Sequence, residues 1–217
     1  MSFYSPSQRA WQERFDSVPL ADRVEQAIVA DAVDNFFGGF IASRDFFFLA
    51  TVDGNGMPTV SYKGGAAGLV RVVDPTTLAF PNYDGNGMFL SVGNIDDSHK
   101  IGMLFIDLET PNRLRIQATA SVSDDDELLS TWPGADLVVR ARVEKVFHNC
   151  GRYIHKHERV SASKYVPAAD GTVPYPAWKR IDMVQDVLPT KDRGQAELQG
   201  GVITFDDYIG KLLAGDS

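Results

Sequence analysis

The stretch FFFLATVDGNGMPTVSYK, residues 46–63, decides the fold expected of this 217-residue chain. Two β-like runs, residues 46–52 and 57–63, flank a turn that is rich in Asp, Gly and Asn. That arrangement predicts a β-hairpin. Pro58 lacks an amide hydrogen, so the second run is expected to start a strand or to lie at a sheet edge. The first run is continuously apolar, which predicts a strand buried on both faces.

Five more strand-like runs follow this hairpin. They cover residues 69–73, 78–82, 100–107, 113–122 and 137–147. In residues 113–122 apolar and polar residues alternate, as in a strand with one buried face. This succession of strands, with short helices inserted, predicts a mainly β fold of the α+β class: an antiparallel barrel with helical decoration.

Residues 1–44 are expected to form a helical segment ahead of the strands. The run SPSQ at residues 5–8 matches a capping box with proline at the first helical position. Helical spacing continues at residues 20–32 and 34–43. A further helix is expected at the acidic run of residues 123–132, because negative charge stabilises a helix N-terminus.

The length of the chain suits one domain with appendages. We expect a barrel domain at residues 45–190, between the helical segment of residues 1–44 and a polar tail at residues 191–217. The tail is expected to lie on the surface or to be partly mobile.

The charge balance argues against some classes of partner. The chain has 21 basic and 29 acidic residues and a net charge of −8, whereas nucleic acids and anionic membranes need a basic face. Cys150 is the single cysteine, so no intrachain disulfide forms. The first residues lack an apolar leader, and no apolar run approaches membrane-spanning length. We therefore expect a cytoplasmic protein.

The pentapeptide DGNGM of residues 53–57 recurs at residues 84–88, where a helical pattern follows it. A glycine-rich turn that opens a helix presents backbone N–H groups, and the helix N-terminus adds positive potential. Asn86, Ser91 and Asn94 add side-chain donors. This second copy therefore predicts a phosphate site, with a helix start that binds no ligand as the alternative.

Two further clusters suit a flat cofactor. With Val60 expected to point inward, Ser61 and Lys63 share the opposite face, and a lysine beside glycines can approach a ring or its phosphate. Arg115 and Gln117 project from one face of their strand, where they could bind the carbonyl oxygens of a flavin pyrimidine. A surface lysine and an exposed barrel face are the alternatives.

Metal binding is not expected. His148, Cys150, His155 and His157 are close in sequence, but their spacing matches no standard structural zinc site. Nothing marks His148 as a base for Cys150 either.

In their order along the chain, these clusters resemble the pyridoxamine 5′-phosphate oxidase-related family of FMN-binding split β-barrels, and its bacterial FMN-dependent branch most closely. The matching runs are PTVSYKGG, FPNYDGNGMFLSVGNI, GMLFID, NRLRIQATA and NCGRYIHK. The resemblance covers roughly residues 40–190 and implies a split antiparallel barrel of the FMN-binding type.

The resemblance also implies a homodimer with two FMN molecules in clefts between the subunits. Carried over by position, the residues along the flavin are Ser61, Tyr62, Lys63 and Gly64. Those near the ribityl chain and phosphate are Asn82, Asp84, Asn86, Gly87 and Met88, with Ser91 and Asn94 behind them. The next barrel strand supplies Arg113, Arg115 and Gln117. The residues that close the cleft are Arg152 and Trp178.

The implied function is that of an FMN-dependent oxidoreductase acting on a small molecule, with no catalytic residue assigned. The patterns with which the true oxidase binds its substrate, Tyr-x-x-x-Arg-x-x-x-Ser and a late Arg-x-His, are both missing. Oxidation of pyridoxamine 5′-phosphate is therefore not expected. Three alternatives stay open: a flavin-binding protein without turnover, a stress-linked interaction protein, and a reductase that uses the deazaflavin F420.

Overall fold

The structure, a computed structural model, describes residues 3–216 and divides them into two compact units, the first ending at Thr172 and the second beginning at Val173. The domain boundaries expected after residues 44 and 190 stay predictions. The elements are α1 (Pro6–Arg14), α2 (Val18–Ile28), β1 (Val29–Ala30), α3 (Asn35–Ala42), β2 (Phe46–Val52), β3 (Pro58–Gly64), β4 (Arg71–Asp74), β5 (Thr77–Tyr83), α4 (Leu90–Ser98), β6 (Lys100–Asp107), β7 (Asn112–Ser123), β8 (Ala135–Asn149), α5 (Gln195–Leu198) and α6 (Phe205–Leu213), with 3₁₀ helices at Leu129–Thr131, Ala177–Arg180, Asp182–Val184 and Thr190–Asp192. None of the helices described between residues 3 and 216 is long and apolar enough to cross a membrane.

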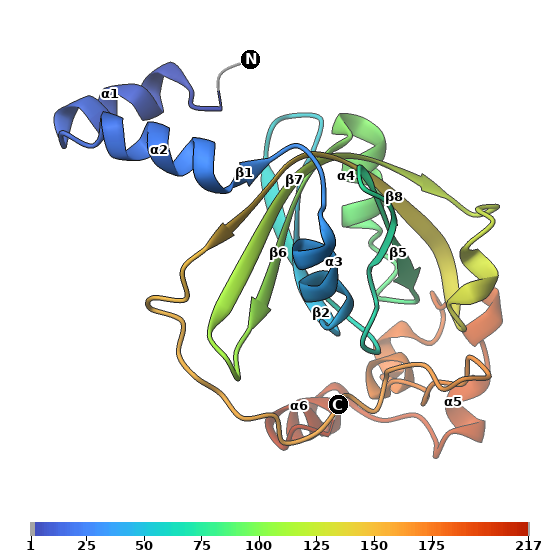
Figure 1. The fold of residues 1–217 in the computed structure, drawn as a ribbon. Helices are drawn as coiled ribbons and strands as arrows, with labels where there is room; N and C mark the ends of the chain where they lie inside the picture. The colour runs from blue at the N-terminus through green and yellow to red at the C-terminus, as the bar shows by residue number, and fades with distance from the viewer. Residues whose placement is uncertain (1–2, 217) are drawn as a thin grey trace. The chain divides into compact units, whose positions relative to one another are not determined.

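All strands of the first unit join one antiparallel sheet (Figure 1). Its order is β3-β2-β6-β7-β8-β5-β4, and β1 pairs with β8. The long β8 pairs with both β7 and β5, which lets the sheet curve. Strands β3 and β4 are the two edges of the sheet and do not pair with each other. This arrangement confirms the expected mainly β fold, a split antiparallel barrel with helical decoration. Pro58 opens the edge strand β3, as its missing amide hydrogen predicts.

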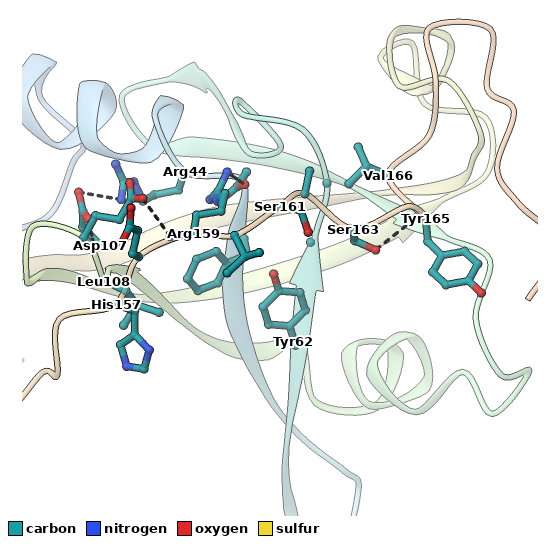
Figure 2. Close-up of a pocket in the computed structure, with 18 residues that line it drawn as sticks. Arg44, Tyr62, Asp107, Leu108, His157, Arg159, Ser161, Ser163, Tyr165 and Val166 are labelled. Carbon is teal, nitrogen blue, oxygen red and sulfur yellow. Dashed lines mark hydrogen bonds and ion pairs between the residues drawn. The ribbon is translucent and has the colours of Figure 1, made fainter. Parts of the chain in front are cut away.

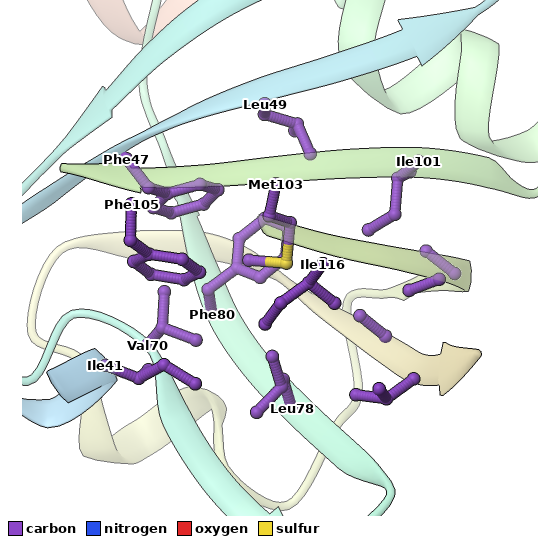
Figure 3. Close-up of a cluster of buried hydrophobic side chains, with 14 of the residues drawn as sticks. Ile41, Phe47, Leu49, Val70, Leu78, Phe80, Ile101, Met103, Phe105 and Ile116 are labelled. Carbon is purple, nitrogen blue, oxygen red and sulfur yellow. The ribbon is translucent and has the colours of Figure 1, made fainter. Parts of the chain in front are cut away.

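The core fills the inner face of this sheet. The ring centroid of Phe47 lies 5.1 Å from that of Phe80 and 5.3 Å from that of Phe105 (Figure 3). Helix α3 adds Ile41 and helix α4 adds Ile95, and both side chains are fully buried. Truncating a buried phenylalanine of this kind costs about 3–5 kcal/mol, so each of these rings contributes strongly to the stability of the first unit.

The expectation that β2 is buried on both faces is wrong. Phe47, Leu49 and Thr51 are buried on the inner face, whereas Phe46 and Phe48 are only half-buried on the outer face. Strand β6 shows the same alternation. The alternation of buried and half-buried residues cannot be recognised in the sequence, because the residues on the outer face are apolar too. The chain therefore exposes a partly apolar outer sheet face.

The prediction of a helix at residues 123–132 is also wrong, since only Leu129–Thr131 forms a short 3₁₀ turn. Its acidic side chains make local bonds instead of capping a helix. Asp126 accepts the amide hydrogen of Leu128, and its carboxylate forms an ion pair with Arg140. Short polar side chains that bond to nearby backbone favour turns over helix.

The structure contains the helices expected near the N-terminus, with one difference in length, and it adds helices in the last residues. The capping box at α1 is confirmed, because Ser5 and Gln8 exchange side-chain and backbone hydrogen bonds. Helix α2 ends at Ile28, earlier than expected, because the next two residues pair with β8. In the second unit, the stretch expected as a polar tail contains α5 and α6.

Candidate functional site

Ser61 and Lys63 lie on the inner face of β3, at the open edge of the barrel. Their cross-strand partners are the buried residues Leu49 and Phe47. Val60, expected to point inward, is 65% exposed on the outer face. The pairing of Ser61 with Lys63 on one face is correct, but its direction is the reverse of the prediction. An alternating edge strand does not reveal on which side the barrel closes.

The second DGNGM copy lies between β5 and α4, which confirms the predicted strand-to-helix junction. Ser91, in the first turn of α4, places its Oγ 3.2 Å from the Oγ of Ser61. Helix α4 follows Phe89, and no side chain caps its start. Within the loop, the Asn86 side-chain carbonyl accepts the amide hydrogen of Met88 at 3.0 Å. The first turn of α4 thus contacts the inner face of β3 through its Ser91 side chain.

Other residues of this region hold the loop and helix in place. Gly87 has a φ of 76°, which glycine adopts without strain. The amide of the buried Asn94 donates to Thr51 Oγ1 at 3.0 Å and so fastens α4 to β2. Asn82, at the end of β5, donates to the backbone carbonyl of Tyr83. Asn94 and Asn82 therefore use their amide groups inside the protein.

Lys63 is the charged group of this site. Burial lowers the pKa of its amine below the ordinary lysine value. Within residues 3–216 no carboxylate forms an ion pair with it. Lys63 lies two residues after Ser61, on the same face of β3. A half-buried amine without a counterion at this place favours an anionic ligand.

Arg115 and Gln117 project from the opposite, outer face. Arg115 is paired across strands with Leu104, and Gln117 with Gly102. Leu104 is in turn the partner of Phe48. Because cross-strand partners share a face, one chain does not bring Arg115 and Gln117 to the same ligand as Lys63.

The remaining predicted residues are dispersed. Arg113 is half-buried, and its Nε lacks a hydrogen-bond partner, as does Oδ1 of its cross-strand partner Asn149. Arg152 is exposed, with its guanidinium 5.2 Å from the centroid of the Tyr153 ring. Trp178 belongs to the second unit. Their roles at a cofactor stay predictions.

A cavity of about 450 Å³ opens at the other face of β3 (Figure 2). It lies between the end of that strand and the extended segment of residues 157–166. Tyr62 and Gly64 line it, as does Phe46 of β2. The sequence motifs gave no sign of this segment, because it has neither hydrophobic periodicity nor a recognisable motif.

Metal-ligating side chains do not gather at either place. Within the described residues, no group of three or more His, Cys, Asp and Glu side chains could hold a metal ion.

A family model described as pyridoxamine 5′-phosphate oxidase matches residues 36–164, more than half of the 217 residues. The chain therefore belongs to the pyridoxamine 5′-phosphate oxidase family. No curated protein matches it.

Several solved structures are similar to this chain. HupZ of Group A Streptococcus has 19% identity and a TM-score of 0.46, with 58% of this chain and 99% of that chain covered. A Lactobacillus delbrueckii protein named after pyridoxamine 5′-phosphate oxidase has 26% identity and a TM-score of 0.44, with 54% and 95% covered. An FMN-binding protein from Syntrophomonas wolfei has 14% identity and a TM-score of 0.40, with 64% and 96% covered. Because each TM-score is low, family membership rests on the family model.

Proposed function

We propose that this protein binds FMN and acts as a flavin-dependent oxidoreductase on a small molecule. The observation that carries the proposal is the meeting of two anion-favouring features at one edge of the barrel. The uncapped start of α4 touches β3 through Ser91 and Ser61, 3.2 Å apart. Lys63, on the same face of β3, is half-buried and has no ion-pair partner within residues 3–216.

The residues at this edge fit a flavin mononucleotide. The amides at the start of α4 and the amine of Lys63 would hold the phosphate, since helix N-termini and lysine both stabilise that charge. Gly64 does not open this edge to a flat ring, because the space that its side chain would fill faces the Tyr62 ring on the outer face of β3. When bound, FMN supplies reversible two-electron redox chemistry.

We further propose that the active species is a homodimer. The outer sheet face carries the half-buried side chains of Phe48, Leu104 and Phe147 beside Arg115 and Gln117. A second copy that covers this face would remove apolar surface from water. In such a dimer Arg115 and Gln117 would lie at the interface, where they would be available to the cofactor of the partner subunit.

The absorption spectrum of the purified protein tests the cofactor. Oxidised-flavin maxima, with FMN released on denaturation, support the proposal, and an F420 spectrum points to the deazaflavin alternative. A colourless protein that FMN does not reconstitute refutes it and favours an interaction role. If FMN binds but none of a panel of reductants and acceptors changes its redox state, the protein is a flavin carrier without turnover.

Paired variants test the site and the assembly. Lys63→Met should weaken FMN binding, whereas Lys100→Met, at the exposed start of β6, should leave it unchanged. Light scattering should give a dimer, and Leu104→Glu on the outer face should convert it to a monomer that binds FMN more weakly. A stable monomer of the unmodified protein at micromolar concentration contradicts the dimer.

A further inference from the structure

We propose that the cavity beside Tyr62 is a second binding site, for a flat organic cation such as an aryl ammonium. It lies on the outer face of β3, whereas Ser61 and Lys63 face the inside of the barrel. The proposal therefore goes beyond the cofactor site and does not depend on which cofactor that site holds.

Two stacked aromatic rings form one wall of the cavity. The rings of Phe46 and Tyr62 lie 5.3 Å apart with an interplanar angle of 15°. The Tyr62 ring leans along β3 over Gly64, where an added Cβ would lie 2.6 Å from its Cε1 atom. The absence of a side chain at Gly64 thus leaves room for the Tyr62 ring in this position.

The opposite wall is the segment of residues 157–166, which is fastened to the sheet (Figure 2). The amide of His157 donates to the carbonyl of Leu108 at 2.9 Å. Arg159 forms an ion pair of 2.7 Å with Asp45, directly ahead of β2. These bonds hold the segment in front of the aromatic pair. The space of about 450 Å³ between them lies within the range of small-molecule sites.

The charges of the lining disfavour an anion. Both arginines of the lining are already paired, Arg159 with Asp45 and Arg44 with Asp107 at 2.9 Å. Two further carboxylates, Glu109 and Glu158, belong to the lining as well. The lining thus has more carboxylates than arginines, and its potential favours a positive ligand.

The aromatic wall adds to this preference. A cation over the face of a tyrosine ring is attracted by the ring's electron density, and the attraction is strongest where water is excluded. Burial, and next the nearby Asp45 carboxylate, raise the pKa of the Tyr62 phenol, so its hydroxyl stays neutral around pH 7. A flat ring that carries an ammonium group matches both the stacked rings and the carboxylates.

Calorimetric titration of the purified full-length protein tests this assignment with two probes of similar size, benzyltrimethylammonium and benzoate. The ammonium should bind about threefold or more tightly than benzoate, the scale of one cation–π contact at a solvent-exposed ring. Tyr62→Leu should weaken ammonium binding by a similar factor. Tyr153→Leu, at another exposed tyrosine, is the matched control and should change nothing.

A second variant keeps the test decisive if Tyr62→Leu does not fold. Glu158→Gln changes an exposed side chain and should weaken the ammonium about threefold, an effect that salt should reduce, while Glu197→Gln in α5 should have no effect. Equal binding of ammonium and benzoate, or no binding of either at millimolar concentration, overturns the proposal. Release of bound cofactor by the ammonium also overturns it, because the probe would then share the inner site.

Discussion

The same five residues, Asp-Gly-Asn-Gly-Met, close a hairpin at residues 53–57 and lead into α4 at residues 84–88. In the first copy, Oδ1 of Asp53 accepts the amide hydrogens of Asn55 and Met57 at 2.9 and 2.8 Å. That turn satisfies its own donors. The second copy ends at a helix whose first amides have no side-chain cap.

The difference comes from the flanking elements and not from the pentapeptide. Strands β2 and β3 run in register from Phe46 opposite Gly64 to Val52 opposite Pro58, so the first copy only has to reverse the chain. The second copy joins a strand to a helix that runs in another direction, which leaves backbone donors open. We expect the first copy to affect stability and the second to affect ligand affinity.

The largest expected effect separates FMN from riboflavin, which lacks the phosphate. If the second copy and the start of α4 hold that phosphate, riboflavin should bind about 100-fold more weakly, equivalent to ~2.7 kcal/mol. Fluorescence titration of the cofactor-free protein with each compound measures this ratio. Equal affinities would erase the functional distinction between the two copies.

Many of the structural features around the two copies could be predicted from the sequence. The hairpin, the strand-to-helix junction and the alternation of residues 113–122 were all foreseen, because turn residues and period-two patterns reflect local geometry. The outward direction of Val60 was not, since an edge strand's inner face depends on how the whole sheet curves. The cavity beside residues 157–166 was not foreseen either, because an extended segment held by ion pairs to distant residues has no local signature.

The second prediction concerns Lys63, the charge expected to act with the second copy. Burial lowers the pKa of its amine in the free protein, so the amine loses its proton at a lower pH than an exposed lysine does. FMN affinity should fall as the pH rises through that pKa, because the phosphate prefers the protonated amine. Lys63→Met should remove this dependence and weaken FMN by roughly tenfold or more, as for a lost charge-assisted hydrogen bond.

Dissociation constants measured from neutral to alkaline pH test this, with Lys100→Met as the control. Lys63→Met should also stabilise the cofactor-free protein, because the free-energy cost of holding a charged amine in a half-buried position disappears. Thermal unfolding without FMN measures that gain. An unchanged pH dependence in Lys63→Met would assign the phosphate charge to another group.

The third prediction compares the two side chains that organise the turns. Asp53→Ala leaves two backbone amides without their acceptor and should destabilise the protein by about 1–2 kcal/mol. Asn86→Ala removes the acceptor of one amide, that of Met88, and should cost less stability. Its main effect should be a several-fold loss of FMN affinity. Denaturant unfolding and FMN titration of both variants, measured side by side, check the two directions.

The smallest expected effects come from the two glycines with positive φ, Gly56 at 86° and Gly87 at 76°. An added Cβ would meet no atom within 4 Å at either position, so alanine brings backbone strain and no clash. That strain costs about 1 kcal/mol at each site. In Gly56→Ala it should lower the melting temperature by ~2–4 °C and leave FMN affinity unchanged.

In Gly87→Ala the loop ahead of α4 can relax in the free protein, so the cost should instead appear when the loop closes on the phosphate. FMN should then bind a few-fold more weakly, with little change in melting temperature. If both variants lose the same stability and neither loses affinity, the second copy is a turn like the first, and the phosphate must be held by Lys63 and α4 without it.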